Sequence, residues 1–455
     1  MRGAAMSERH FRLVVAGGEG DGDEPDRLRA QAYAGFIARR DGAELLGSDD
    51  SACAALLDRL SAAGLAFRER SEDGSARVIH VARPQTAERF ANGASEPWPS
   101  ALVKKLGKTV RRTPGALFRF PQEEGGDAIH VFITDWSPCP AACALAVHAE
   151  HPAAAGVEDG FTGRFVRHPL TGDLLPVLVA DWVKPAFGTG AVLVNPAHDR
   201  VDLAYARRIG LPIRFALAPE GFDGEPDGWI APPLIKAGRS VRTGFYDGLD
   251  IHEATSTYFD VLAARGLAER HEDVRLPAAE IARIEPDGSL MPSEALRVAA
   301  ALAAAGDASR PTLVLSAAAA RSSAAALAPL LADLDLAPRV IALGAVERTA
   351  TLEDEAGARA IAIAARPDQP AVVRKDQLDQ VRRFAELHER LGGADGAAAV
   401  EGLPSGPLRQ SIAAGDPAGA FKALYALQKD LAAAETPDPS ALAAYRTGCR
   451  VLLGG

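Results

Sequence analysis

Two kinds of hydrophobic pattern divide the chain. Near the beginning, a compact apolar run at 11–16 predicts a buried strand, and apolar positions recur at helical spacing over 26–40 and 51–65. Strand and helix alternate again over 292–335, and a last strand is expected at 358–365. Alternation of this kind is typical of a doubly wound α/β domain with a parallel sheet.

The middle of the chain has a different texture. From 118 to 276, short β-branched runs are separated by turn residues, which predicts a β-rich domain inserted into the α/β domain. The runs are FRF, IHVFIT, LLPVLVADWV and AVLVNPA. Before them, the stretch 91–116 is rich in Gly, Pro and basic residues and is interpreted as a connector. A helix at 377–391 and two further helices are expected to end the chain.

Composition limits the class of protein. The chain has 455 residues, of which 47% are hydrophobic and 24% charged, as expected for a globular protein of about three domains. It has no apolar run of 18 residues and no apolar signal segment, so we expect a soluble, cytoplasmic protein without a membrane partner. Four cysteines make no disulfide framework. The net charge of −10 excludes general attraction to DNA and leaves only a local basic patch for nucleic acid.

Residues 157–213 carry a long string of motifs with fixed spacing. It includes Thr162-Gly163, HPLTG at 168–172, GTGAV at 188–192 and PAHDxxD at 196–202. This string closely resembles the editing domain of bacterial leucyl-tRNA synthetase, a class I aminoacyl-tRNA synthetase. Weaker similarity extends to the family's entry into the editing domain, its exit at 245–276, and the helix that begins its anticodon-binding bundle.

The resemblance gives the expected fold class and domain organisation. It implies an α/β multidomain protein, in which a degenerate Rossmann-like doubly wound domain is split by a β-rich editing domain and followed by a short C-terminal α-helical bundle. The expected segments are 1–117 for the first half of the Rossmann-like domain with its connector, 118–277 for the editing-like β-barrel domain, 278–375 for the second half, and 376–455 for a truncated anticodon-binding-like region.

Two motifs that class I synthetases need for amino-acid activation are missing. The place of the HxGH signature reads DEPDRLR, and no lysine lies between Lys236 and Lys375, where the lysine-rich KMSKS loop belongs. The acidic residues at 21–26 would also repel a triphosphate. We therefore expect a degenerate ATP site, no cofactor and no leucine-tRNA ligase activity.

The resemblance also implies a binding site for an aminoacyl group. In the family, an aspartate of the HDxxD segment holds the α-ammonium group of the amino acid, and Asp202 occupies that position. The accompanying substrate-binding candidates are Asp199, His198, Asn195, Gly188, Thr189 and Gly190. Asn195 replaces an aliphatic residue of the family. An alternative is that Asp199 simply caps the helix that follows.

The family's threonine-rich catalytic loop aligns with 133–138. Thr134 is retained, and Ser137 offers another hydroxyl, so these two are the catalytic candidates. Asp135 stands in place of the family's arginine and Pro138 in place of its later threonine. These changes remove a cation, a hydroxyl and a backbone donor.

Two further groups of residues leave alternatives open. Cys139, Cys143, His148 and His151 have ligand types suited to zinc, but the same positions align with packed residues of the editing fold, so no metal is predicted. A stretch without acids between 97 and 120 contains the candidate tRNA contacts Lys104, Lys105, Lys108, Arg111 and Arg112. Its alternative is a solvated ribbon.

Three functions agree with this sequence. The first is binding of an aminoacyl group, on tRNA or on a small carrier, with deacylation of the ester as the reaction. The second is a non-catalytic pseudoenzyme that binds tRNA or a true aminoacyl-tRNA synthetase. The third is tRNA-dependent aminoacyl transfer in specialised metabolism.

Overall fold

The chain divides into two compact units. The computed structural model describes residues 12–16, 24–71, 73–93, 97–184, 189–218, 238–305, 311–348, 365–391, 403–434 and 436–453. The split unit comprises Met1–Val110 and Leu276–Gly455, and the inserted unit comprises Arg111–Arg275. The inserted unit thus begins earlier than the editing-like segment expected from the sequence, 118–277.

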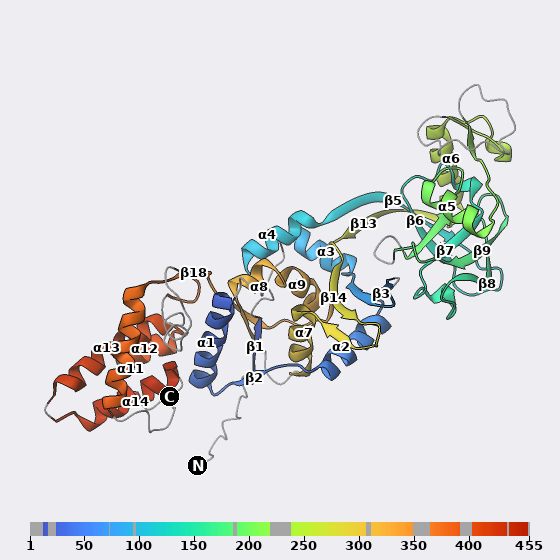
Figure 1. Ribbon diagram of the computed structural model, residues 1–455. Coiled ribbons are helices and arrows are strands. Elements are labelled where there is room, and N and C mark those ends of the chain that lie inside the picture. The colour runs from blue at the N-terminus through green and yellow to red at the C-terminus, as the bar shows by residue number, and fades with distance from the viewer. Residues whose placement is uncertain are drawn as a thin grey trace, which may run out of the picture. The chain divides into compact units, whose positions relative to one another are not determined.

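A parallel sheet lies in the split unit (Figure 1). Its strand order is β17 (Arg339–Ala342), β16 (Thr312–Leu315), β1 (Arg12–Ala16), β2 (Glu44–Leu46), and every neighbouring pair is parallel. The two central strands come from the two separate parts of the chain. Helix α1 (Glu24–Asp41) follows β1, and α7 (Glu294–Ala304) packs against β1. The predicted mixed α/β architecture is confirmed to this extent.

A second sheet in the split unit is antiparallel and was not expected from the sequence. Its order is β15 (Leu290–Pro292), β14 (Ala279–Ile284), β4 (Ala76–His80), β3 (Ala66–Arg70). Helix α2 (Asp50–Ala62) contacts β3 and β15, and Asp49 accepts the Ala52 N–H as its N-cap. Helices α3 (Pro84–Ala91) and α9 (Ala324–Asp333) also contact each other.

The expected connector is wrong in its central part, because residues Ser100–Thr109 form helix α4. Leu102, Val103 and Leu106 are buried along one side of this helix. Gly107 is required by close packing, since a Cβ there would lie 2.8 Å from the carbonyl oxygen of Phe90. The apolar positions i, i+1 and i+4 are helical spacing that the surrounding Gly, Pro and basic residues obscured.

The C-terminal part of the chain is helical, as predicted, but it contains one more described helix than expected. After β18 (Val346–Arg348) and β19 (Ala371–Val373), α11 (Lys375–Arg390) is followed by α12 (Pro407–Ala413), α13 (Pro417–Ala433) and α14 (Pro439–Leu453). These helices lie together at the C-terminal end of the chain (Figure 1). The rings of Phe384 and Tyr445 are buried in the hydrophobic cluster that they share. The strand predicted at 358–365 lies outside the described residues except for Ala365.

The inserted unit is rich in β-structure, as predicted. One sheet has the order β10 (Ala191–Val194), β7 (Ala144–Val147), β9 (Leu174–Val179), β8 (Gly160–Arg167). In the other, β5 (Arg111–Phe120) pairs with β13 (Ala268–Arg275) as a long antiparallel ribbon and with β6 (Ile129–Ile133) (Figure 1). The short strands β11 (Leu217–Ala218) and β12 (Arg239–Ser240) form a further pair.

Two helices complete this unit and help to enclose its core. Helix α5 (Arg200–Ile209) follows β10, and α6 (Ile251–Ala264) begins with a capping box made by Asp250 and Glu253. The rings of Phe118, Phe120 and Tyr258 are fully buried in one hydrophobic cluster with residues of β7 and β9. This packing fixes the ends of β6 and β10, where the predicted site residues lie.

Candidate functional site

Asp202 lies in the first turn of α5 and is almost wholly buried, with 6% of its surface exposed. Its Oδ2 accepts a hydrogen bond of 2.7 Å from the backbone N–H of Asn195, which follows the end of β10. The helix begins here because Asp199 accepts the backbone N–H groups of Val201 and Asp202, at 2.7 and 3.0 Å. Asp199 is exposed and is the N-cap, as the alternative interpretation had it.

Burial raises the pKa of Asp202 to about 7. The N–H of Asn195 acts in the opposite direction, and the nearby charge of Asp199 raises the pKa further. Among the described residues, no positive charge compensates the desolvated carboxylate. A cation placed against it would recover much of the lost solvation energy, which makes Asp202 suited to binding an ammonium group.

The neighbours of Asp202 differ in their surroundings. Asn195 is partly exposed, and its buried side-chain Oδ1 has no hydrogen-bond partner among the described residues. His198 is buried, and its Nε2 accepts the N–H of Ala216 at 3.2 Å, while its ring meets that of Phe215 edge to face. His198 thus supports the turn before α5. The residue whose backbone N–H holds Asp202 thus also carries a buried side-chain acceptor without a partner among the described residues.

The other predicted residues of this strand lie at its opposite end. The hydroxyl of Thr189 donates to the backbone carbonyl of His130, at the start of β6. Gly190 is buried with a φ of 74°, and its carbonyl accepts the N–H of His148. Gly188 lies outside the described residues. The structure therefore brings Asn195, His198, Asp199 and Asp202 together and leaves Thr189 and Gly190 at the beginning of β10.

The two catalytic candidates have opposite surroundings. Ser137 is fully buried, and both its hydroxyl and its backbone N–H donate to Asp135, at 2.7 and 3.1 Å. The hydroxyl of Ser137 is therefore engaged within the loop, by the side chain of Asp135. Thr134 is exposed at the end of β6. It lines a cavity of about 490 Å³ together with Trp136, Arg270 and His271.

Arg270 was not identified from the sequence. Its guanidinium lies over the ring of Phe259, 4.1 Å from the ring centroid, and 5.2 Å from that of Trp136. Trp136 is held by donation from its indole N–H to the carbonyl of Thr255, at 2.6 Å. The pairing of β13 with β5 brings Arg270 close to Thr134, and no local sequence pattern predicts this pairing.

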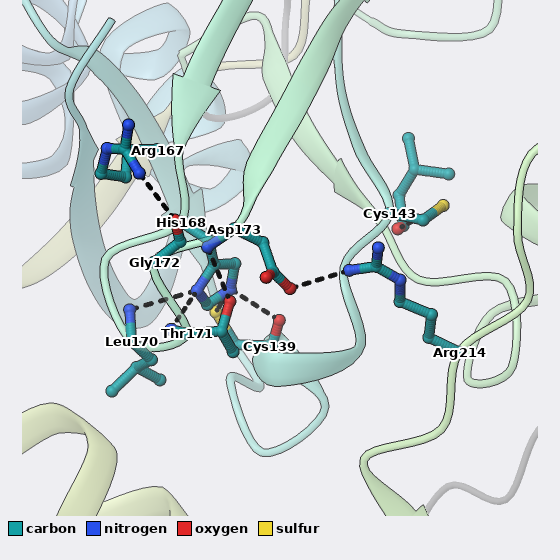
Figure 2. A network of polar contacts seen from close by, with 10 residues as sticks. Cys139, Cys143, Arg167, His168, Leu170, Thr171, Gly172, Asp173 and Arg214 are labelled. Carbon is teal, nitrogen blue, oxygen red and sulfur yellow. Dashed lines mark hydrogen bonds and ion pairs between the residues drawn. The ribbon is translucent and has the colours of Figure 1, made fainter. Parts of the chain in front are cut away.

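The HPLTG motif forms a tight turn around His168 (Figure 2). The Nδ1 of this imidazole accepts the N–H groups of Leu170 and Thr171, both at 3.1 Å, so its proton is on Nε2, which donates to the carbonyl of Cys139 at 2.9 Å. Burial lowers the pKa of His168 to about 4. Arg214 closes the same turn through an ion pair with Asp173. The neutral His168 is thus a structural residue that joins two segments.

The four possible zinc ligands serve the packing of the inserted unit. Both thiols are buried, and burial raises the pKa of Cys139 and of Cys143 to about 12. The Nδ1 atoms of His148 and His151 accept the backbone N–H groups of Glu150 and Ala153. Among the described residues, no three His, Cys, Asp or Glu side chains gather as a metal site.

The predicted tRNA contacts are divided between the units. Lys104, Lys105 and Lys108 are exposed on α4 of the split unit, and Lys105 donates to the carbonyl of Arg321 at 3.4 Å. Arg111 and Arg112 begin β5 of the inserted unit, where Arg112 forms an ion pair of 2.7 Å with Glu272. Lys104 and Lys108 are one helical turn apart and face solvent together.

Charged side chains link the start of α1 to segments near the end of the parallel sheet. In doubly wound sheets, nucleotides bind beyond the carboxyl ends of the strands. Here the buried Arg29 donates to the carbonyls of Gly344, Arg366 and Gln369, at 2.6, 2.9 and 3.0 Å. Asp26 pairs with Arg321 and accepts the N–H of Val346. These side chains therefore make internal contacts at the start of α1.

A family model described as the editing domain of leucyl-tRNA synthetase matches residues 153–263. The leucine–tRNA ligase of Azotobacter vinelandii is 34% identical over 213 residues, 39% of this chain and 24% of that protein. That of Bordetella parapertussis is 41% identical over 152 residues, 33% of this chain and 17% of that protein. The chain thus matches no more than a quarter of these relatives' length.

A solved structure was also found, the agnB2 LeuRS of Agrobacterium radiobacter K84 in a ternary complex with tRNA and LeuAMS. It is 14% identical and aligns with a TM-score of 0.43, covering 99% of this chain and 84% of that one. In the described parts of the present chain, no helix is long and apolar enough to cross a membrane. On the family match and the curated relatives, residues 153–263 of the inserted unit are similar to the editing domain of leucyl-tRNA synthetase.

Proposed function

We propose that the inserted unit binds the aminoacyl end of an aminoacyl-tRNA and hydrolyses its ester bond. The observation that carries this proposal is Asp202, a buried carboxylate that no cation of the described segments compensates, in a stretch that matches the editing-domain family model. The α-ammonium group of an amino acid supplies the missing charge. Asn195 offers an acceptor beside it, which favours an amino acid whose side chain carries a hydrogen-bond donor.

Thr134 is the residue that we assign to the reaction. Its exposed hydroxyl can orient the attacking water or the ester carbonyl, and Arg270 supplies a positive charge at the same cavity. This arginine comes from β13, whereas the family's arginine belongs to the threonine-rich loop, where this chain has Asp135. In this proposal the charge removed from the loop is replaced from a neighbouring strand.

Binding without turnover is the second candidate, and the catalytic loop favours it. Ser137 is fully buried on Asp135, so Thr134 is the only catalytic candidate of the sequence that the structure leaves exposed. A protein of this kind would bind charged tRNA, or the synthetase that charges it, without releasing the amino acid. The cations Lys104 and Lys108 are the proposed phosphate contacts in either case.

For the split unit we propose that amino-acid activation has been lost. The contacts of Asp26 and Arg29 support this, because they engage the start of α1 where the activation motif would bind phosphates. The chain should therefore catalyse no amino-acid-dependent exchange between pyrophosphate and ATP. Such exchange above the level of a protein-free blank would refute this part of the proposal.

The test of deacylation uses the full-length chain and a panel of tRNAs, each charged with one radiolabelled amino acid. Release of the label by the wild type and its loss in Asp202→Asn are expected, with rates reduced at least a hundredfold. Asp181→Asn is the matched control, because Asp181 is largely exposed and lies outside the site. Binding of charged tRNA without release would support the second candidate. Neither binding nor release across the panel would overturn both.

A further inference from the structure

A second cavity of the inserted unit, about 490 Å³ in volume, lies at the beginnings of β6 and β10. Thr189 and His130, which line it, are joined by the hydroxyl-to-carbonyl bond described above. Thr134 and Asn195 follow the other ends of the same two strands. At about 3.3 Å per residue, His130 and Thr134 are separated by roughly 13 Å. This cavity is therefore distinct from the surroundings of Asp202.

A guanidinium group is held in position at the cavity. Arg164, on β8, donates from Nη1 to the side-chain carbonyl of Gln122 at 3.1 Å. Gln122 is fixed in turn, because its side-chain amide donates to the carbonyl of Asp127 at 2.7 Å. This one bond orients the guanidinium and uses only one of its five N–H donors. Arg164 is thus prepared for an anion before any ligand arrives.

Two imidazoles line the same cavity. The Nδ1 of His151 accepts the N–H of Ala153, so the proton of the neutral ring is on Nε2. Burial lowers the pKa of His151, which keeps the ring in this neutral donor form at pH 7. His130 is exposed on the neighbouring strand, and Asp127 is the acid of the lining. One guanidinium and two imidazoles from three elements therefore surround the space.

We propose that this cavity binds a phosphate ester of about the size of a mononucleotide. The lining includes donor-bearing side chains from three elements, which are β6, the segment at 151–153 and β8, and several separate donors suit the oxygens of a phosphate better than those of a carboxylate. Ile129, Pro152 and Ala153 provide apolar walls for the remainder of the ligand. The volume lies in the range of small-molecule sites. The inference stands independently of deacylation at Asp202.

The phosphate could belong to a free nucleotide or to the end of an RNA. Calorimetric titration of the full-length chain with AMP, adenosine, inorganic phosphate and the trinucleotide CCA separates these sources. AMP is expected to bind and adenosine to bind at least tenfold more weakly, because adenosine lacks the phosphate. A trinucleotide that binds more tightly than AMP would identify an RNA end as the source, and one that does not would identify a free nucleotide.

Arg164→Gln should weaken AMP binding at least tenfold, and Arg164→Lys should restore part of it. Arg167→Gln is the matched control on the same strand, since Arg167 is exposed, pairs with Glu123 and does not line the cavity. Asp202→Asn should leave AMP binding unchanged, which keeps this test separate from that of deacylation. No binding of any probe, equal binding of AMP and adenosine, or an Arg164→Gln protein that binds AMP like the wild type would overturn the proposal.

Discussion

Replacing Asp202 by asparagine should stabilise the protein above neutral pH. The carboxyl group is buried, and its pKa rises from 3.8 to about 7 on folding. The folded state therefore holds a proton that the unfolded state has lost between these two values. Stability that this group contributes is greatest below pH 4 and is lost as the pH rises to about 7. Asparagine keeps the shape and an acceptor for the Asn195 N–H but carries no charge.

The magnitude follows from the shift in pKa. A difference of about 3 units at about 1.4 kcal/mol each gives an upper bound of about 4 kcal/mol. The opposing effect of the Asn195 N–H is already contained in this pKa, and placing an amide NH2 group where the carboxyl Oδ1 lies removes part of the gain. We expect the asparagine variant to be about 2 to 4 kcal/mol more stable than the wild type at pH 8 and similar to it at pH 4.

Hydrogen exchange of the amides of α5, followed by mass spectrometry on the full chain, measures this effect locally. Helix α7 of the split unit is the internal reference, since the substitution does not touch it. His168 titrates in the same pH range with the opposite sign, because its pKa falls on folding. The informative quantity is therefore the difference in protection between variant and wild type at each pH.

One result would refute the reasoning. If the asparagine variant exchanges its α5 amides faster than the wild type at pH 8, the charged carboxylate of Asp202 stabilises the fold. The carboxylate would then be stable in its buried position without a bound cation. The argument for binding an ammonium group would then lose its physical basis. A difference that is the same at pH 4 and pH 8 would show that the carboxyl group does not titrate in this range.

Three further predictions concern other buried groups. Arg29→Ala should lower the stability of the split unit by about 3 kcal/mol, because three backbone carbonyls lose their donor. Thermal unfolding measures this loss, and Arg59→Ala, on the exposed side of α2, is the control that should have little effect. An unchanged melting temperature for Arg29→Ala would contradict the prediction. The four cysteines, all buried, should react with a thiol reagent at pH 8 only after denaturation, and rapid reaction of the native chain would count against their burial. As the pH falls from 6.5 to 4, the unfolding free energy of His168→Gln should rise by about 3 kcal/mol relative to that of the wild type, because the variant lacks the protonation of His168 that opposes folding; urea unfolding of both proteins at each pH measures this difference.

Local patterns predicted much of the fold, and long-range pairing accounts for most of what they missed. The central strands and α1 could be predicted from continuous apolar runs and helical spacing, since these depend on neighbouring residues. Pairing of β4 with β14 joins segments about 200 residues apart, and no local signal specifies it. Helix α4 shows the opposite failure, because its apolar stripe was present but basic and small residues between its positions concealed it.

In the candidate site, too, local sequence predicted some features, whereas others depend on long-range packing. A motif located Asp202, but its burial depends on how α5 packs and could not be seen in the sequence. The contacts of Ser137 could have been predicted, because a serine two residues after an aspartate is typical of a turn in which the aspartate accepts from the backbone N–H and hydroxyl of that serine. Arg270 and Arg29 had no comparable signal, since their partners are distant in the chain.

The interruption of the split unit has a consequence for synthesis on the ribosome. Strand β1 pairs with β16, whose residues emerge roughly 300 positions later, so at about 5 to 20 residues per second β1 waits about 15 to 60 s for its neighbour. The inserted unit, by contrast, is contiguous and has all its strands once residue 275 has been made. During translation the editing-type domain can therefore fold first, while an apolar strand and helix α1 remain without their sheet and need protection from aggregation.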